Sequence, residues 1–457
     1  MFDIIVIGSG PGGYTAAVRA AQLGFRTAVV ERSEPGGICL NWGCIPTKAL
    51  LRSAQVLQEA RQAESFGVHI AGSVTPDIAA IVARSRAVAA GMNKGVEFLL
   101  KKNNIALIAG TAVLQADKSV EVTAGDGGKQ TITAAHVIIA TGARAHSLPC
   151  APVDGKKIIG YREALTPAAI PETLAVIGSG AIGCELAYFY RCMGAEVTLI
   201  EYMDAIAPLE DADTSAQLSR SFRKAGIKVM TSAQVIQVDT SGEGCTLRLQ
   251  TKKGEETLAA SKVLSAAGIT ANIENIGLER TGVVVERGRI KVDGHYRTNV
   301  AGIYAIGDVI ATPALAHVAS AEAITCVEYI AGLSPEPVDY ENVPACLYTT
   351  PEAASVGLTE RAAREQGYEL RIGKFSYVAS GKAAAHGDKD GFVKLIFDAA
   401  TDRLLGAHMT GSHVTEMIAG LVTARRLGVR GKDILCCIHP HPSMSEAIFE
   451  AAALVQH

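Results

Sequence analysis

Short apolar runs that lead into glycine-rich turns occur twice along the chain. Residues 4–7 and 174–177 are unbroken apolar runs, and each continues into a glycine motif and an amphipathic helical pattern. A second strand pattern follows each helix, at residues 27–30 and 196–200. Strands that alternate with helices in this way form parallel sheets from βαβ units. The pattern therefore predicts an α/β fold with two Rossmann-like units.

Both turns carry the same four residues at the same spacing. The first set is Gly8, Gly10, Gly13 and Glu31, and the second set, displaced along the chain by one constant offset, is Gly178, Gly180, Gly183 and Glu201. Glycines at these positions allow a tight turn and a close approach of the backbone to a pyrophosphate, and the acid accepts hydrogen bonds from ribose hydroxyls. Simple tight turns are the alternative, but the repeat in two βαβ contexts favours two dinucleotide sites.

Cys39 and Cys44 lie in a glycine-rich segment ahead of a helical pattern. Residues five apart in a regular helix differ by about 7.5 Å in axial position alone, which exceeds the roughly 4.4–6.8 Å between Cα atoms that a disulfide tolerates. The pair can bridge only if the backbone is distorted, and the means are provided by Gly36, Gly37, Gly43 and Pro46. Cys44 would then begin a helix, whose positive end lowers the pKa of a thiol. These features predict a redox-active pair.

Two dinucleotide sites and a redox pair together indicate a flavin relay. A nicotinamide moves hydride, whereas a disulfide is reduced through thiolate steps, and a flavin connects the two kinds of chemistry. The first site adjoins the cysteines, so it should hold FAD. At the second site Glu201 is followed by Tyr202, Met203 and Asp204, without an arginine that could bind a 2′-phosphate. This site is therefore expected to prefer NAD(H) over NADP(H).

The remaining patterns set the domain organisation. Amphipathic stretches at residues 49–63 and 77–102 are typical of helices, and apolar strands at 137–142, 263–268 and 303–308 continue the Rossmann-like units. The candidate cofactor contacts at the ends of these strands are Thr141, Gly142, Gly268 and Asp308. We expect an FAD-binding domain at 1–145, an NAD-binding domain at 146–269, a central region at 270–339 that completes the FAD domain, and a C-terminal α+β domain at 340–457.

Composition excludes several classes of function. The 457-residue chain has a net charge of −3, which gives no electrostatic footprint for nucleic acid or anionic lipid. No apolar run approaches the roughly 20 residues needed to cross a bilayer. We expect no signal peptide, because a strand pattern already begins at residue 4. The ten cysteines are scattered, as is typical of reduced thiols. We expect a cytoplasmic protein without nucleic-acid or membrane partners and without a metal site.

A proline-rich segment near the C-terminus carries a candidate acid–base pair. Residues 439–442 are His-Pro-His-Pro, so a regular helix is excluded at the histidines. Ser443 can cap a following helix that contains Glu446, and this carboxylate can then reach back to fix the tautomer of a histidine. Disulfide exchange needs such a base because dithiols are mostly protonated at neutral pH. A surface loop with incidental histidines is an equally good interpretation of the sequence alone.

With these motifs assembled, the chain resembles the dihydrolipoamide dehydrogenases, a branch of the FAD-dependent pyridine nucleotide–disulfide oxidoreductases. The resemblance extends over essentially the whole chain and is most specific at residues 37–48, 305–308 and 441–446 and in the paired glycine motifs. It implies one non-covalent FAD per subunit and a homodimer that forms its contact through the C-terminal domain. It also implies, as partners, the lipoyl domains of 2-oxoacid dehydrogenase acyltransferases or of the glycine cleavage carrier protein.

The resemblance implies a role for each matching residue. Cys39 resembles the interchange thiol that meets the substrate, and Cys44 resembles the thiol that contacts the flavin. His441 resembles the catalytic base, which the other subunit supplies in this family, and Glu446 resembles its orienting carboxylate; His439 is supporting. Further resemblances concern cofactor contacts, namely Lys48 near the flavin ring, Glu185 as its ion-pair partner, Asp308 at the ribityl chain and Ala316 in a segment that faces the flavin. The implied reaction is the oxidation of protein-bound dihydrolipoamide by NAD⁺.

The chain departs from the family pattern in two places. The family often has an arginine in the segment that corresponds to residues 268–272, where this chain has none. The adjacent Cys436 and Cys437 faintly resemble the terminal cysteine pair of mercuric reductases, but here the chain continues beyond them to His457. Adjacent cysteines bridge only with strain, so we expect buried, inert thiols at this position.

Other functions compete with this interpretation. The nearest alternative is another disulfide reductase, acting on glutathione, trypanothione or mercuric ion. Glu201 argues against the NADP-dependent members, and His441 argues against a metal-ion reductase. A flavoprotein transhydrogenase is disfavoured because it needs no cysteine pair. From a different class, the chain could serve as a structural or sensory subunit docked to an acyltransferase core.

Overall fold

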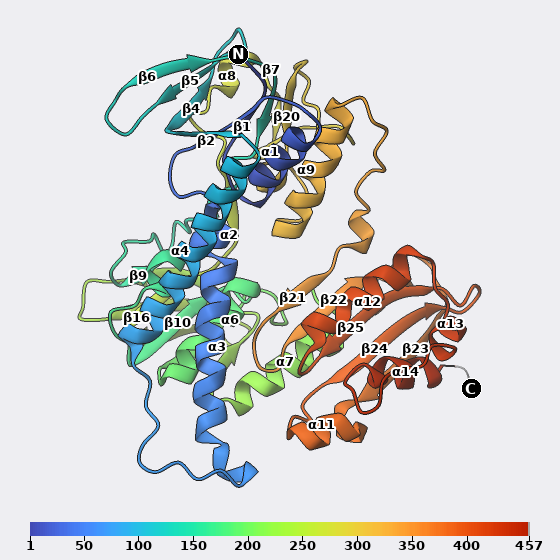
Figure 1. Ribbon diagram of the computed structural model, residues 1–457. Coiled ribbons are helices and arrows are strands. Elements are labelled where there is room, and N and C mark those ends of the chain that lie inside the picture. Colours follow the sequence, from blue (N-terminus) through green and yellow to red (C-terminus); the bar gives the residue numbers. More distant parts are fainter. Residues whose placement is uncertain (456–457) are drawn as a thin grey trace. The chain divides into compact units, whose positions relative to one another are not determined.

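The computed structural model describes residues 1–455, which form two compact units. The first unit comprises Met1–Ala49, Val82–His146 and Ile269–Tyr340, and the second comprises Leu50–Ile81, Ser147–Gly268 and the chain from Glu341 onward. Each unit is therefore assembled from segments that lie far apart in the sequence, as the colours of Figure 1 show.

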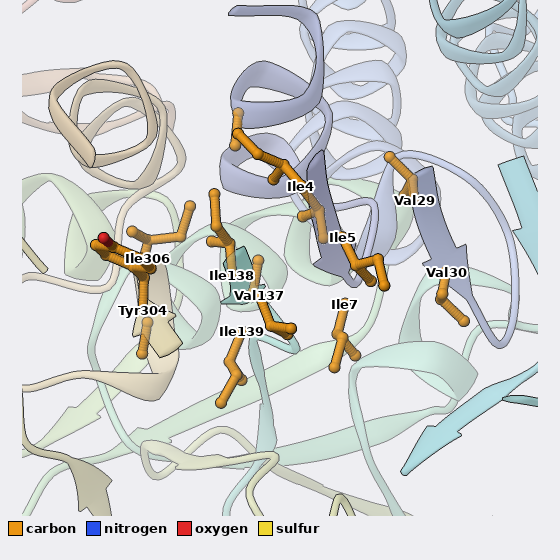
Figure 2. Close-up of a cluster of buried hydrophobic side chains, with 14 of the residues drawn as sticks. Ile4, Ile5, Ile7, Val29, Val30, Val137, Ile138, Ile139, Tyr304 and Ile306 are labelled. Carbon is orange, nitrogen blue, oxygen red and sulfur yellow. The ribbon is translucent and has the colours of Figure 1, made fainter. Parts of the chain in front are cut away.

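The first unit is built on a five-stranded parallel sheet. In spatial order its strands are β20 (Ile303–Ala305), β7 (Ala134–Ile139), β1 (Phe2–Ile7), β2 (Thr27–Glu31) and β3 (Ala106–Ala109). Figure 2 shows the buried isoleucines and valines of β1, β2 and β7, with Tyr304 and Ile306 of the β20 segment beside them. Unbroken apolar strands of this kind are stable only when both faces of a sheet are covered. The strands predicted at residues 4–7 and 27–30 are confirmed.

Helices of the first unit cover the sheet and carry the cysteine segment. They are α1 (Pro11–Gln22), α2 (Gly37–Trp42), α8 (Leu278–Thr281) and α9 (Ala316–Ile330), together with the start of α3 (Cys44–Arg61) and most of α4 (Ile78–Lys102). α1 packs against α9, although the two helices lie far apart in the sequence (Figure 1). The helices predicted near residues 49–63 and 77–102 correspond to α3 and α4.

The second unit contains a parallel sheet with the same arrangement. Its strands, in spatial order, are β9 (Ile158–Ile159), β16 (Lys262–Ser265), β10 (Thr173–Ile177), β11 (Glu196–Ile200) and β12 (Lys228–Met230). In both sheets the strand before the glycine motif is central, and the strand that ends in the acid lies next to it. The associated helices are α5 (Tyr161–Leu165), α6 (Ala181–Met193) and α7 (Ala212–Lys224). Two Rossmann-like units are therefore confirmed.

The C-terminal part of the second unit is an antiparallel sheet with helices, as the α+β prediction requires. Its strands, in spatial order, are β21 (Ala345–Leu347), β22 (Ala353–Gly357), β25 (Leu404–Thr410), β24 (Phe392–Asp398) and β23 (Leu370–Ser376). Its helices are α10 (Glu360–Glu365), α11 (Gly381–His386), α12 (Val414–Arg426), α13 (Gly431–Leu435) and α14 (Glu446–Ala453). β22, β24 and β25 share a hydrophobic core with α12 and α14.

A buried ion cluster joins this sheet to α7. The side chain of Lys394, on β24, is only 3% exposed, and its Nζ lies 2.8 Å from carboxylates of Asp211, Asp213 and Glu360. Asp211 is the N-cap of α7 and its side chain is 1% exposed. A charge removed from water to this degree is tolerated only when it is paired and hydrogen-bonded. The cluster therefore fixes α7 against the C-terminal sheet.

Short antiparallel sheets and turns complete both units. They are β4 (Thr111–Leu114), β5 (Val120–Thr123) and β6 (Lys129–Ile132); β13 (Gln234–Asp239), β14 (Cys245–Thr251) and β15 (Gly254–Ala260); β8 (Ala143–Ala145) with β17 (Ile269–Ala271); β18 (Val285–Glu286) with β19 (Arg289–Ile290); and the 3₁₀ turns η1 (Ala63–Phe66), η2 (Gly307–Val309), η3 (Tyr340–Asn342) and η4 (Tyr377–Ala379). Among residues 1–455, every helix is too short or too polar to span a bilayer.

Candidate functional site

The two glycine loops have the same backbone geometry. Gly8 has a φ of +100° and Gly178 a φ of +97°, a conformation that side-chain-bearing residues rarely adopt. A Cβ atom on Gly13 would lie 1.9 Å from the carbonyl oxygen of Gly8, and the corresponding distance between Gly183 and Gly178 is also 1.9 Å. Both loops therefore require glycine at these two positions, for the turn itself and for the approach of helix to strand.

The middle glycine of each motif leaves open space at a helix N-terminus. Gly10 is the N-cap of α1 and Gly180 the N-cap of α6, and neither cap has a side-chain hydrogen bond. A Cβ on either residue would meet no atom within 4 Å. The free amides and the positive end of a helix dipole at such a position suit an anion. Both loops therefore fit the pyrophosphate of a dinucleotide.

The acids at the ends of β2 and β11 are held by identical contacts. The Ser9 amide and hydroxyl donate to Glu31 Oε2 at 2.8 and 2.7 Å. The Ser179 amide and hydroxyl donate to Glu201 Oε2 at 2.9 and 2.6 Å. Sequence reasoning missed these serines, although each stands between the first two glycines of its motif. They orient each carboxylate beside its loop, and the other oxygen keeps acceptor capacity for ribose hydroxyls.

The cysteine segment has the broken backbone that the spacing predicted. α2 ends at Trp42, Gly43 has φ −145° and ψ −111°, and α3 begins at Cys44. α2 itself follows Gly36, whose φ of +96° is left-handed. Cys44 therefore occupies the first position of an 18-residue helix, where the helix dipole favours a thiolate.

The side chains of Cys39 and Cys44 are in hydrogen-bond contact with each other. A hydrogen bond with the Cys44 side chain, followed by burial, raises the pKa of Cys39, and the Lys48 ammonium opposes this shift. Side chains close enough to hydrogen-bond can close to a disulfide with little movement. The geometry therefore supports a redox pair with Lys48 in its neighbourhood.

Residues expected around the flavin gather in the first unit. Asp308 lies in η2, directly after β20, where burial raises the pKa of its carboxyl and the Arg289 guanidinium opposes the shift. Arg289 also donates a hydrogen bond to the Asp308 carbonyl oxygen. Ala316 is the first residue of α9, which packs against α1. These positions suit contacts with a dinucleotide at the first loop.

The loop in which the family often has an arginine receives one from a neighbouring strand. Arg144, on β8, donates to the Ala271 carbonyl and to Asn272 Oδ1, each at 3.1 Å. Asn272 in turn is bonded to Thr141, whose hydroxyl donates to its carbonyl at 2.7 Å. Gly142 follows with a φ of +67°. Thr141 and Gly142 are thus tied to residues 269–272 within the first unit.

Predicted contacts in the second unit are only partly brought together. Glu185 lies buried on α6 and accepts a hydrogen bond from the Tyr348 amide at 3.2 Å. Gly268 has a φ of +86°. Lys48 belongs to the first unit and Glu185 to the second, so their ion pair stays a prediction.

The C-terminal acid–base pair is formed as expected, but not through the expected cap. His441 Nδ1 lies 2.8 Å from Glu446 Oε1, and the Ser443 amide donates to Glu446 Oε2 at 2.8 Å. The Ser443 amide and then His441 lower the pKa of Glu446. The prediction that Ser443 caps the helix was wrong, because α14 begins at Glu446 with Ser445 as its N-cap and without a side-chain cap bond. The His441 side chain is 80% exposed.

Two neighbouring features clarify the rest of this segment. His439 Nδ1 lies 3.2 Å from the Cys437 carbonyl and its ring packs near Phe449, as a supporting residue would. The expectation of buried thiols at Cys436 and Cys437 was wrong, since both side chains are exposed. The reason is that α13 ends at Leu435, which leaves both cysteines on a surface turn beyond the helix.

The chain is similar to known proteins over nearly its whole length. A family model described as pyridine nucleotide-disulphide oxidoreductase matches residues 2–323, and a model for the dimerisation domain of that family matches residues 343–452. Dihydrolipoyl dehydrogenases from Rhizobium etli and Zymomonas mobilis are 50% and 48% identical to the chain, each over 98% of this chain and 97% of its own length. The crystal structure of LpdA from Mycobacterium tuberculosis matches with a TM-score of 0.92 at 29% identity, covering 99% of both chains.

Proposed function

We propose that this chain, which belongs to the pyridine nucleotide-disulphide oxidoreductase family, is an NAD-dependent dihydrolipoyl dehydrogenase. The observation that carries the proposal is the contact between Cys39 and Cys44 at a break between two helices, in a chain with two dinucleotide loops. Relatives of that name match the chain over 98% of its length at 48–50% identity, which supports the same activity.

The cofactors are FAD and NAD(H). When bound, FAD accepts two electrons from the thiol pair and passes them to NAD⁺ as hydride. We assign FAD to the first loop, with Glu31 at its ribose and Asp308 at its ribityl chain, and NAD(H) to the second loop, with Glu201 at its ribose. A carboxylate at this position repels a 2′-phosphate, so NADP(H) should bind weakly.

The chain's own residues perform the thiol–disulfide exchange that precedes electron transfer to FAD. This exchange starts from the disulfide between Cys39 and Cys44. Glu446 holds the proton on His441 Nδ1, so the other ring nitrogen takes a proton from a substrate thiol. The substrate thiolate attacks Cys39 Sγ, and Cys44 leaves as a thiolate at the N-terminus of α3. The second substrate thiol attacks the substrate sulfur of this mixed disulfide. The attack forms lipoamide and releases Cys39, which takes up the proton of the second substrate thiol.

The active site is proposed to be shared between two copies of the chain. Residues 343–452 match a dimerisation domain, which supports a homodimer. The high exposure of the His441 side chain in a single chain leaves it available to complete the partner's site. We also propose lipoyl domains of 2-oxoacid dehydrogenase or glycine cleavage complexes as the substrate carriers. We also propose a location in the cytoplasm, where thiols are kept reduced, because the ten cysteines are scattered along the chain.

A steady-state comparison of substrates tests this function. Dihydrolipoamide, glutathione and other dithiols are each assayed with NAD⁺ and with NADP⁺, and we expect the dihydrolipoamide–NAD⁺ pair to be the fastest. Anaerobic bleaching of the flavin band by dihydrolipoamide separates an enzyme from a purely structural subunit. Preference for glutathione with NADP⁺, or a flavin band that dihydrolipoamide leaves unchanged, would contradict the proposal.

A Cys44→Ser variant tests the role of the thiol pair. Serine cannot form the disulfide, so turnover of dihydrolipoamide should fall by about three orders of magnitude or more. The flavin should stay bound, because the first glycine loop is unchanged. Normal turnover by this variant would rule out the mechanism.

A further inference from the structure

Helix α4 contacts the cysteine segment on both sides of the break at Gly43. Within the first unit, its adjacent residues Ser85 and Arg86 donate hydrogen bonds to backbone carbonyls of α3 and α2, respectively. The start of α3 lies beside α2 and α4 in this unit (Figure 1). The sequence offered no signal for these contacts, since donor and acceptor lie far apart along the chain.

Arg86 holds the C-terminal end of α2. Its guanidinium donates to the Asn41 carbonyl at 2.5 Å and lies over the Trp42 ring, 4.0 Å from the ring centroid. Carbonyls in the last turn of a helix have no partner within the helix, and a guanidinium is well suited to bind them and to stack on an aromatic ring. Trp42, the only tryptophan of the chain, therefore serves as a platform for Arg86.

The N-terminal end of α2 is tied to the same helix. Asn93 Nδ2, on α4, donates to the Pro35 carbonyl at 3.0 Å. Asn41, which is only 3% exposed, donates to the same carbonyl at 2.9 Å and to the Gly37 carbonyl at 3.1 Å. Both ends of the helix that carries Cys39 are thus anchored to α4.

The helix that carries Cys44 has an anchor of its own. The Ser85 hydroxyl is buried and donates to the Pro46 carbonyl, in the first turn of α3, at 2.9 Å. Consecutive residues of one rigid helix therefore fix the two segments that the Gly43 break would otherwise leave free to move.

We propose that Arg86 is a positioning residue that holds the Cys39 helix at the distance from Cys44 at which the disulfide forms and opens. The inference deepens the proposed function, since it assigns the device that sets the thiol–disulfide equilibrium of the same pair. Without the Arg86 contact, the C-terminal end of α2, next to Gly43, gains freedom, while Asn93 still holds the chain at its N-terminal end and Ser85 still holds α3. The effective concentration of Cys39 toward Cys44 then falls, and the disulfide becomes easier to reduce.

An Arg86→Met variant tests this inference, with Arg84→Met as its matched control. Arg84 lies two residues earlier on α4 and donates to the Ala49 carbonyl at 2.8 Å, within α3 and five residues beyond Cys44. Both substitutions remove one guanidinium from one helix and keep a long apolar stem, but Arg86→Met removes the bond to the Asn41 carbonyl of α2, whereas Arg84→Met removes a bond to α3. Circular dichroism and flavin content show that each variant is folded.

The primary readout is the equilibrium between dithiol and disulfide. The purified holoenzyme is equilibrated in glutathione buffers, alkylated, and analysed by peptide mass for the Cys39–Cys44 pair. We expect the equilibrium constant for disulfide formation to fall about tenfold in Arg86→Met, which is about 30 mV in reduction potential, and to be unchanged in Arg84→Met. In assays, kcat with dihydrolipoamide should fall in Arg86→Met, whereas ferricyanide reduction by NADH, which bypasses the thiols, should not.

A Trp42→Leu variant provides a second test of the Arg86 contact if Arg86→Met does not fold. It removes the platform beneath the guanidinium and should shift the equilibrium in the same direction by a smaller factor. An unchanged equilibrium in the folded variants, or an equal shift in Arg84→Met, would overturn the inference. Failure of the unaltered protein to oxidise dihydrolipoamide would instead overturn the proposed function and leave this equilibrium result standing.

Discussion

Alanine in place of Gly13 or Gly183 provides a matched test of the two dinucleotide loops. In each case the new Cβ would lie 1.9 Å from a glycine carbonyl oxygen, that of Gly8 or that of Gly178. Ordinary contact begins at 3.4 Å, so helix and loop must move apart until the carbonyl oxygen reaches that distance. The neighbour is backbone and has no rotamer that could relieve the clash.

The cost of this clash can be converted into cofactor affinity. Overpacking in a closely packed region costs about 1–3 kcal/mol, and 1.4 kcal/mol corresponds to a tenfold change in a dissociation constant. Because the shift moves the amides that face the pyrophosphate, the cost falls on cofactor binding. We expect binding to weaken roughly 5- to 150-fold at the loop that is changed.

Two measurements separate the loops. Flavin content after gel filtration reports the first loop, and NADH titration followed by fluorescence reports the second. Gly13→Ala should lose flavin on purification, whereas Gly183→Ala should retain flavin and bind NADH weakly. Tight NADH binding by Gly183→Ala, or full flavin retention by Gly13→Ala, would refute the reasoning.

Three further predictions concern the second unit. Glu446→Gln should lower kcat with dihydrolipoamide about 10- to 100-fold, because an amide stabilises the His441 imidazolium less well, and should leave NADH–ferricyanide activity unchanged; an unaltered kcat would contradict the role of Glu446. Lys394→Met should destabilise the fold by about 3–5 kcal/mol in urea titrations, since it leaves a buried carboxylate unpaired, and a change below about 1 kcal/mol would count against the cluster. Lys394 also lowers the pKa of Glu360 below 4.5, so its contribution to stability is complete above that pH and is lost as the pH falls further. Urea midpoints measured from pH 7 to pH 3 should therefore decline below about pH 4.5, and less steeply in Lys394→Met.

The sequence was sufficient for features that depend on local periodicity and spacing. Two strand–glycine–helix units and the helix break between Cys39 and Cys44 each involve residues close in sequence, whose geometry follows from allowed backbone conformations. For the C-terminal segment the sequence patterns left a histidine–Glu446 contact and an incidental surface loop equally open, and the family resemblance singled out His441. The repeat of one motif at a constant offset favoured two dinucleotide sites over simple tight turns, which a single motif could not have done.

Features that depend on packing between distant segments were not accessible in this way. The contact of Arg86 with Asn41 depends on how α4 lies against α2, which no periodicity specifies. The exposure of Cys436 and Cys437 depends on where α13 ends, and helix ends are among the least certain features of a sequence pattern. The Ser443 amide donates to Glu446, but the Ser443 hydroxyl pairs with the Ser445 hydroxyl and does not cap the helix, a choice between neighbouring polar groups that the sequence pattern does not specify.

The two sheets differ in the residues that follow one edge strand, which is β20 beside β7 in the first sheet and β9 beside β16 in the second. Both sheets present the same loop, the same serine and the same acid, so none of these can tell a flavin dinucleotide from a nicotinamide dinucleotide. Beside β7, however, β20 brings Asp308 to the end of the sheet, whereas β9 beside β16 leads to Gly160 and α5. Two sheets with the same glycine loop can thus differ in the ligand they bind because different residues follow the edge strand of each sheet.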